Sequence, residues 1–272
     1  MKRLLTFARV DGDLVRVSVR GEGRPILLIM GLGGNLEMWD PLERELNRRG
    51  VQTIAYDASG TGESPPRSTP RRMPGLARQA ARLLDVLGLP RVDVLGVSFG
   101  GAVAQELALR NPHRVGHMVL AGTACGLGGM PGHPVALALL ANPLRYYSPA
   151  FFRLTAPFLY GDGLADDDRL VRAQIAARHA RPPSAWGFAG QLTAAAGWTS
   201  LPWLHHLRTP TLVLTGERDR IVPPCNGRIL AARIPDARLE VVPGGHLFLM
   251  EHPDDCADSI STFLELEAAN GS

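Results

Sequence analysis

Lysine, cysteine and long apolar runs are all scarce in this 272-residue chain. Lys2 is the single lysine, so the 29 basic residues are almost all arginines, and these are spread along the chain rather than gathered in a block. With a formal net charge of only +3, this distribution is typical of a solvated surface. We therefore expect no nucleic-acid partner.

The few cysteines argue against a disulfide framework and against a metal site. Cys125, Cys225 and Cys256 stand far apart, with neither the spacing of metal ligands nor the density of a disulfide-rich domain. The adjacent pair His205-His206 lacks further ligands that would make a zinc site. We expect a reducing compartment, no metal and no cofactor.

A membrane span is also excluded, because no segment offers about 18 uncharged apolar residues in a row. The N-terminus begins like a signal peptide, but Arg9 and Asp11 interrupt the apolar stretch before it reaches signal length. The expected location is the cytoplasm.

The residues that are abundant favour a globular α/β protein. Hydrophobic residues make up 45% of the chain, enough for a large core. Two alternating stretches, 4–10 and 14–19, flank the turn signal Asp11-Gly12 and predict a hairpin. Unbroken apolar runs, typical of parallel strands buried on both faces, follow at 26–30, 51–56, 92–97, 118–121, 211–215 and 239–242.

Helical patterns alternate with these runs, at residues 39–49, 76–87, 99–110, 226–233 and 253–266. This alternation predicts a mostly parallel, twisted sheet flanked by helices, with ligands bound beyond the carboxyl ends of the strands. Between 126 and 201 no strand is predicted, and the segment reads as a helical insertion. We therefore predict a core of residues 1–125 and 202–272 and a helical cap of residues 126–201.

The cap segment and its borders hold ten of the sixteen aromatic residues. These side chains can pack the cap onto the core, or line an apolar substrate pocket. For the pocket we propose Trp186 and Trp198 from the cap, together with Met30 and Leu247 from the core.

The strand predicted at 92–97 runs into Gly96-Val97-Ser98-Phe99-Gly100, directly before a helix. This is the nucleophile-elbow pattern G-x-S-x-G in its strand-to-helix context. The glycines let neighbouring backbone pass close to a strained turn that presents the serine hydroxyl. Because that hydroxyl is a weak nucleophile, it needs a base.

Two loops supply an acid and a base in the chain order typical of this pattern. Asp219 follows the penultimate strand, and His246 follows the last one. An imidazole titrates near neutral pH, so it can take the proton of Ser98 and return it to a leaving group. We predict that Asp219 orients His246 and that these three residues form a catalytic triad.

A tetrahedral intermediate also needs hydrogen-bond donors for its oxyanion. We expect these to be the backbone N–H groups of Phe99, which begins the elbow helix, and of Leu32, in the glycine-rich loop after the first long strand. Asp57 also follows a strand, but its neighbourhood, Asp57-Ala58-Ser59-Gly60, favours a structural turn.

Taken together, these motifs resemble one family of α/β-hydrolases, the intracellular medium-chain-length polyhydroxyalkanoate depolymerases. The resemblance covers most of the chain, including the segments 31–37, 56–62, 96–101, 131–132, 203–205, 210–214 and 245–249. Its most particular feature is Gly197-Trp198-Thr199-Ser200 followed by Trp203 in the cap.

The resemblance implies an α/β-hydrolase that cleaves 3-hydroxyacyl esters, small or polymeric, with the family's Ser, Asp and His at Ser98, Asp219 and His246. The sequence departs from the family at Phe99, where Trp is usual. Met30 also stands where many hydrolases carry a polar residue. The chain length of the ester, a homo-oligomeric state and contact with a polymer granule stay open.

Three other functions share these motifs. A general carboxylesterase would use the same triad on short esters, and a cofactor-free haloperoxidase or perhydrolase would use it with another acceptor. A ligand receptor that has lost catalysis would keep the fold alone. Carboxylate-nucleophile relatives are disfavoured because Ser98 occupies the elbow.

Overall fold

The structure is a computed structural model that describes residues 3–161 and 167–270. In chain order its strands and helices are β1 (Arg3–Val10), β2 (Asp13–Arg20), β3 (Arg24–Ile29), η1 (Leu36–Trp39), α1 (Asp40–Arg48), β4 (Val51–Tyr56), α2 (Met73–Val86), β5 (Val92–Val97), α3 (Phe99–Arg110), η2 (Pro112–Arg114), β6 (Val115–Ala121), α4 (Pro134–Ala141), α5 (Leu144–Tyr147), α6 (Pro149–Tyr160), α8 (Asp168–Ala180), α9 (Ala185–Ala195), η3 (Leu201–His206), β7 (Thr211–Gly216), α10 (Cys225–Arg233), β8 (Ala237–Val242), α11 (Phe248–Glu251) and α12 (Pro253–Asn270).

Within the described residues, eight strands form one sheet in the order β1-β2-β4-β3-β5-β6-β7-β8. The strands from β3 to β8 are parallel to one another, whereas β2 is antiparallel to both β1 and β4. The predicted mostly parallel sheet of an α/β protein is therefore confirmed. The predicted hairpin is confirmed as well: Asp11 and Gly12 have φ of 49° and 85°, the positive values that a tight two-residue turn requires.

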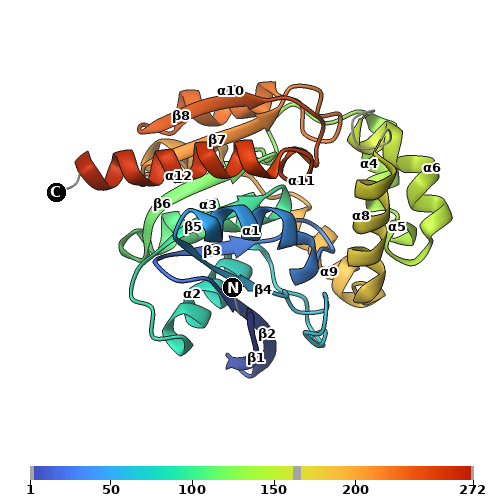
Figure 1. Ribbon diagram of the computed structural model, residues 1–272, viewed down its shortest axis with the longest axis horizontal. Helices are drawn as coiled ribbons and strands as arrows, with labels where there is room; N and C mark the ends of the chain where they lie inside the picture. The colour runs from blue at the N-terminus through green and yellow to red at the C-terminus, as the bar shows by residue number, and fades with distance from the viewer. Residues whose placement is uncertain (1–2, 162–166, 271–272) are drawn as a thin grey trace.

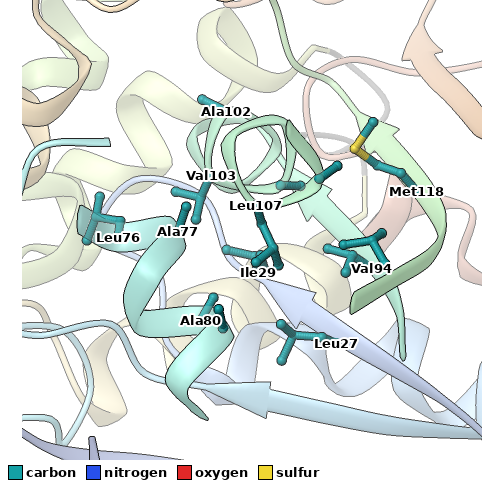
Figure 2. Packing of buried hydrophobic residues seen from close by; sticks show 14 of the residues in the cluster. Leu27, Ile29, Leu76, Ala77, Ala80, Val94, Ala102, Val103, Leu107 and Met118 are labelled. Carbon is teal, nitrogen blue, oxygen red and sulfur yellow. The ribbon is translucent and has the colours of Figure 1, made fainter. Parts of the chain in front are cut away.

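Helices cover both faces of the sheet because successive strand residues point to opposite sides. In β3, Leu27 and Ile29 pack in the cluster that includes residues of α2, α3 and α10. Ile26 and Leu28 pack on the other face, against α1 and α12. Figure 2 shows the first of these layers, with helix side chains meeting those of the strands.

The strand β8 departs from the prediction that every apolar run is buried on both faces. It lies at the edge of the sheet, and most of its residues are exposed or half-buried. The central strands β5 and β7, by contrast, are buried throughout. Apolar composition alone does not distinguish an edge strand from a central one.

Between β6 and β7 the described residues form helices α4, α5, α6, α8 and α9, and η3 follows at the return to the core. In Figure 1, helices α4, α5, α6 and α8 gather at the right of the view, beyond one end of the sheet. The two ends of this segment lie side by side, since Leu127 N donates to Trp198 O at 2.9 Å and Ser200 N to Cys125 O at 2.8 Å. We propose on this basis that residues 126–201 form a cap on a core of residues 1–125 and 202–272.

None of the described helices combines the length and the apolar composition that crossing a bilayer requires.

Candidate active site

Ser98 occupies a sharp turn between β5 and α3. Its φ of 54° and ψ of −119° lie outside the regions that side-chain-bearing residues usually adopt. The strain is held by the surroundings: Ser98 N donates to Ala121 O at 2.9 Å, and Thr123 Oγ1 donates to Ser98 O at 2.7 Å. Such strain is common where a side chain must be presented for chemistry.

The glycines of the elbow are required by close backbone contacts. A Cβ on Gly96 would lie 2.4 Å from Gly100 O, and a Cβ on Gly100 would lie 2.0 Å from Ile29 O. These spacings leave no room for a side chain, so α3 packs directly on the sheet and fixes the position of Ser98.

Asp219 and His246 meet at the ends of β7 and β8. His246 Nδ1 lies 2.6 Å from Asp219 Oδ2, and both residues are buried. The other carboxylate oxygen, Oδ1, accepts from the backbone N–H groups of Ile221 and Val222, each at 2.8 Å. The carboxylate is therefore fixed from two sides, and it can hold the imidazole in one orientation.

Ser98 and His246 both line a cavity of about 50 Å³. Among the described residues no hydrogen bond joins their side chains, and such bonds in ligand-free hydrolases are often long and tighten only when substrate binds. The structure therefore brings the three predicted residues to one end of the sheet, with one of the two expected hydrogen bonds formed.

The backbone that is predicted to bind the oxyanion is clamped by the cap. Leu32 O accepts from Tyr146 Oη at 2.5 Å and from Arg145 Nη2 at 3.2 Å. On the other side of the same peptide, Gly33 N donates to Gln191 Oε1 at 2.7 Å. Phe99 is the first residue of α3, where the N–H groups have no partner within the helix.

A family model for the alpha/beta hydrolase fold matches residues 24–166 and 176–253. The chain belongs to the α/β-hydrolase fold family. Its site has the elbow serine and the Asp–His pair at the strand ends where hydrolases of this fold carry their reactive groups.

This hydrolase is similar to named hydrolases over nearly its whole length. A poly(3-hydroxyalkanoate) depolymerase of Ectopseudomonas oleovorans is 41% identical over 262 residues, which cover 95% of this chain and 91% of that protein. A solved hydrolase from Pseudomonas aeruginosa PA01 has a TM-score of 0.80 and 28% identity, covering 96% of this chain and 98% of that one. A thermophilic esterase from Thermogutta terrifontis has a TM-score of 0.81 and 26% identity, covering 97% and 99%. The protein is an ester-hydrolysing enzyme.

Two of the four residues predicted to line the hydrolase's pocket lie in the cavity with Ser98. Met30 and Leu247 both border it. Two further methionines, Met38 and Met250, lie there as well. Methionine side chains adapt easily to the shape of a ligand.

The other two predicted pocket residues lie elsewhere, and the indole N–H group of each donates to a partner away from the cavity. Trp186 is 54% exposed and donates to Arg67 O at 2.7 Å, beside a separate pocket. Trp198 packs against Trp203 and donates to Glu106 Oε1 at 2.9 Å, where α3 meets the cap. Neither side chain is among those that line the cavity with Ser98.

The cap also contributes polar residues to the cavity that no motif in the sequence predicted. Arg145, Tyr146, Tyr160 and Arg178 all border it. Burial raises the pKa of Tyr146, which favours the neutral hydroxyl that donates to the oxyanion loop. No pattern in the sequence distinguishes these two arginines from the many others.

The interpretation of Asp57 as a structural residue is confirmed. Its Oδ1 accepts from Leu36 N at 2.8 Å, and its Oδ2 accepts from Glu63 N at 3.0 Å and Arg16 Nη1 at 3.2 Å. Burial raises the pKa of Asp57 to about 6, against the opposing effect of these donors. The carboxylate thus ties the loop after β4 to η1, next to the oxyanion loop.

Proposed function

We propose that this hydrolase is a serine esterase that cleaves 3-hydroxyacyl esters through an acyl-enzyme, with Ser98, His246 and Asp219 as its catalytic triad. The observation that carries the proposal is the 2.6 Å contact between buried Asp219 and His246, beside a strained elbow serine that borders the same cavity. A carboxylate–imidazole pair next to a serine hydroxyl is the arrangement that nucleophilic acyl transfer needs.

In the first half of the reaction, Ser98 Oγ attacks the ester carbonyl while His246 takes its proton. The oxyanion that forms accepts from the N–H groups of Leu32 and Phe99. When the C–O bond breaks, the alcohol leaves with the proton from His246 and the acyl group stays on Ser98. Asp219 keeps Nδ1 of the imidazole protonated, so that Nε2 can act as the base.

In the second half, His246 takes a proton from water, which attacks the acyl-enzyme. When the bond between the acyl carbon and Ser98 Oγ breaks, the acid leaves and His246 returns the proton to Ser98 Oγ. The cap contributes to both halves, because Tyr146, Arg145 and Gln191 hold the peptide next to the proposed Leu32 donor. A donor that is already in place requires no rearrangement when charge develops.

Similarity to the depolymerase over 95% of the chain supports 3-hydroxyacyl esters as the substrate class. The cap also carries exposed apolar side chains that suit contact with a water-insoluble polymer, namely Leu127, Met130, Val135, Leu144 and Leu154. The free cysteines fit a reducing compartment, and we propose the cytoplasm.

The proposed mechanism is tested by Ser98→Ala, assayed on a short p-nitrophenyl ester. We expect kcat to fall by about 10⁴- to 10⁶-fold, the usual loss when a triad member is removed. Ser259→Ala is the matched control, since Ser259 lies on α12 beside a different pocket. Near-UV circular dichroism checks that both variants fold. Unchanged hydrolysis by folded Ser98→Ala would contradict the mechanism.

The substrate class is tested by a panel that runs from short p-nitrophenyl esters to dispersed medium-chain hydroxyalkanoate polymer, with product acids measured by chromatography. Release of 3-hydroxy acids is the expected result. Activity confined to short esters would leave a general carboxylesterase. A strong preference for peroxide-dependent halogenation in a parallel assay would instead favour a haloperoxidase.

A further inference from the structure

Two buried arginines border the cavity that contains Ser98 and His246. Arg145 comes from α5 and Arg178 from α8, and each is only 2% exposed. Removing a guanidinium from water is costly unless hydrogen bonds and an opposite charge replace the lost hydration. Their partners therefore indicate what else the cavity is built to hold.

Neither arginine has an acidic partner among the described residues. Arg145 donates through Nη2 to Leu32 O at 3.2 Å and to Tyr146 Oη at 3.4 Å. Arg178 donates through Nη1 to both oxygens of Gln174, the backbone one at 3.2 Å. The Nε of each arginine is buried without a partner. Each guanidinium has five N–H donors, so much of this donor capacity is unused.

Aromatic rings contact both cations. The Cζ of Arg145 lies 4.6 Å from the centre of the Tyr146 ring, and the Cζ of Arg178 lies 4.7 Å from the centre of the Phe152 ring. Arg178 also lies 6.0 Å from the Tyr146 ring, so both cations flank one tyrosine. Such contacts offset only part of the free-energy cost of burying a charge. They supply no opposite charge, so each guanidinium stays unneutralised.

The cavity therefore carries two fixed positive charges and no lining carboxylate among the described residues. Arginine binds carboxylates through paired, charge-assisted hydrogen bonds, and these are strongest where water is excluded. A carboxylate that enters with the substrate would supply the missing counter-charge.

We propose that Arg145 and Arg178 bind a carboxylate on the substrate, so that the enzyme prefers esters with a free carboxylate close to the bond that is cut. This inference rests on the proposed esterase function. In a 3-hydroxyacyl oligomer, the ester bond nearest the carboxyl end is separated from the terminal carboxylate by only two carbon atoms. The enzyme then removes units from that end.

The bonds that form and break follow from this placement. Ser98 forms an ester with the acyl group of the shortened oligomer, and the terminal unit leaves as a 3-hydroxy acid whose new hydroxyl takes the proton from His246. Water then cleaves the acyl-enzyme and creates the next free carboxyl end. Each round consumes one water and releases one 3-hydroxy acid.

The test compares a dimer of 3-hydroxybutyrate as the free acid with its methyl ester, and measures cleavage of the internal ester bond by chromatography. The wild-type enzyme should favour the free acid in kcat/KM by about 10- to 100-fold, the range expected for a charge-assisted pair. Arg178→Met should reduce this ratio to near one. Arg153→Gln, which changes an exposed arginine on α6, should leave the ratio as in the wild type.

A second measurement keeps the test decisive if Arg178→Met folds poorly. Butyrate should inhibit wild-type hydrolysis of p-nitrophenyl acetate competitively, whereas butyramide should inhibit at least tenfold less well. Equal kcat/KM for the two dimers, or equal inhibition by the two probes, would overturn the inference and leave the esterase function intact. If the enzyme hydrolyses none of the three compounds, neither of the two dimers nor p-nitrophenyl acetate, both the inference and the esterase function would be overturned.

Discussion

Replacing Asp219 by Asn changes one atom of the carboxylate that holds His246, and the surroundings determine its effect. In the native protein Oδ1 accepts from two backbone N–H groups, of Ile221 and Val222, and Oδ2 contacts Nδ1 of His246. An amide has only one oxygen. If that oxygen keeps the two backbone donors, the NH₂ group faces His246 and selects the tautomer with hydrogen on Nε2, which cannot accept the proton of Ser98.

The opposite orientation of the amide restores the productive tautomer but directs the NH₂ group at two buried N–H donors. Each donor left without an acceptor costs about 1–3 kcal/mol, so this orientation is disfavoured by about 2–6 kcal/mol. The productive form is then populated about 30- to 10⁴-fold less. We therefore predict that kcat/KM for Asp219→Asn falls by about 30- to 10⁴-fold. In the trypsin-type serine proteases the equivalent change lowers kcat by about 10⁴-fold.

The assay is kcat/KM on p-nitrophenyl butyrate at neutral pH, alongside thermal unfolding. Asp167→Asn is the matched control, because Asp167 also accepts from two backbone N–H groups, those of Arg169 and Leu170, but at the start of α8. It should retain wild-type activity. A folded Asp219→Asn enzyme within tenfold of the wild type would refute this account of the carboxylate.

Two further predictions concern residues outside the cavity. Trp198→Phe removes the hydrogen bond to Glu106, so it should lower the free energy of unfolding by about 1–2 kcal/mol. Because Trp198 lies outside the cavity, kcat/KM should stay unchanged. A large loss of kcat/KM in a fully stable variant would contradict the location of Trp198 outside the cavity. Because the folded-state pKa of Asp57 is about 6, above its ordinary value of about 3.9, the folded state binds this proton more tightly than the unfolded state. Its contribution to the free energy of unfolding should therefore fall by about 2 kcal/mol between pH 4 and pH 6 and level off above about pH 7. Urea unfolding of wild type and Asp57→Asn across this range checks it, and equal pH slopes would contradict it.

The fold could be predicted from the sequence because its signals are local and consistent. Val51–Tyr56, Val92–Val97 and Phe99–Arg110 have the predicted bounds, since each run is bordered by a turn or an elbow. The prediction was weaker where the bounds or the burial of an element depend on the residues and elements around it. Met73–Val86 begins before its predicted start because Pro74 can occupy the first helical turn. Strand β8 is exposed because, in the part of the chain that the structure describes, no strand pairs with its outer edge.

The arrangement of the core side of the site was more predictable than that of the cap side. The core side consists of the elbow, Asp219 and His246, which all lie at the carboxyl ends of strands. In a parallel sheet these ends lie at one edge, whatever path the loops take. Trp186 and Trp198 were assigned to the pocket by residue type, but the position of a cap side chain depends on how its helix packs. The same dependence concealed Arg145 and Arg178, whose burial is decided by aromatic residues distant in sequence.

The central claim is that Ser98 is the nucleophile of a hydrolase, and covalent labelling tests it most directly. The enzyme is treated with a fluorophosphonate, digested, and mapped by peptide mass spectrometry. We predict one adduct, on Ser98, which forms far more slowly in His246→Gln. An intact enzyme that takes no label, or takes it on another residue, would contradict the account.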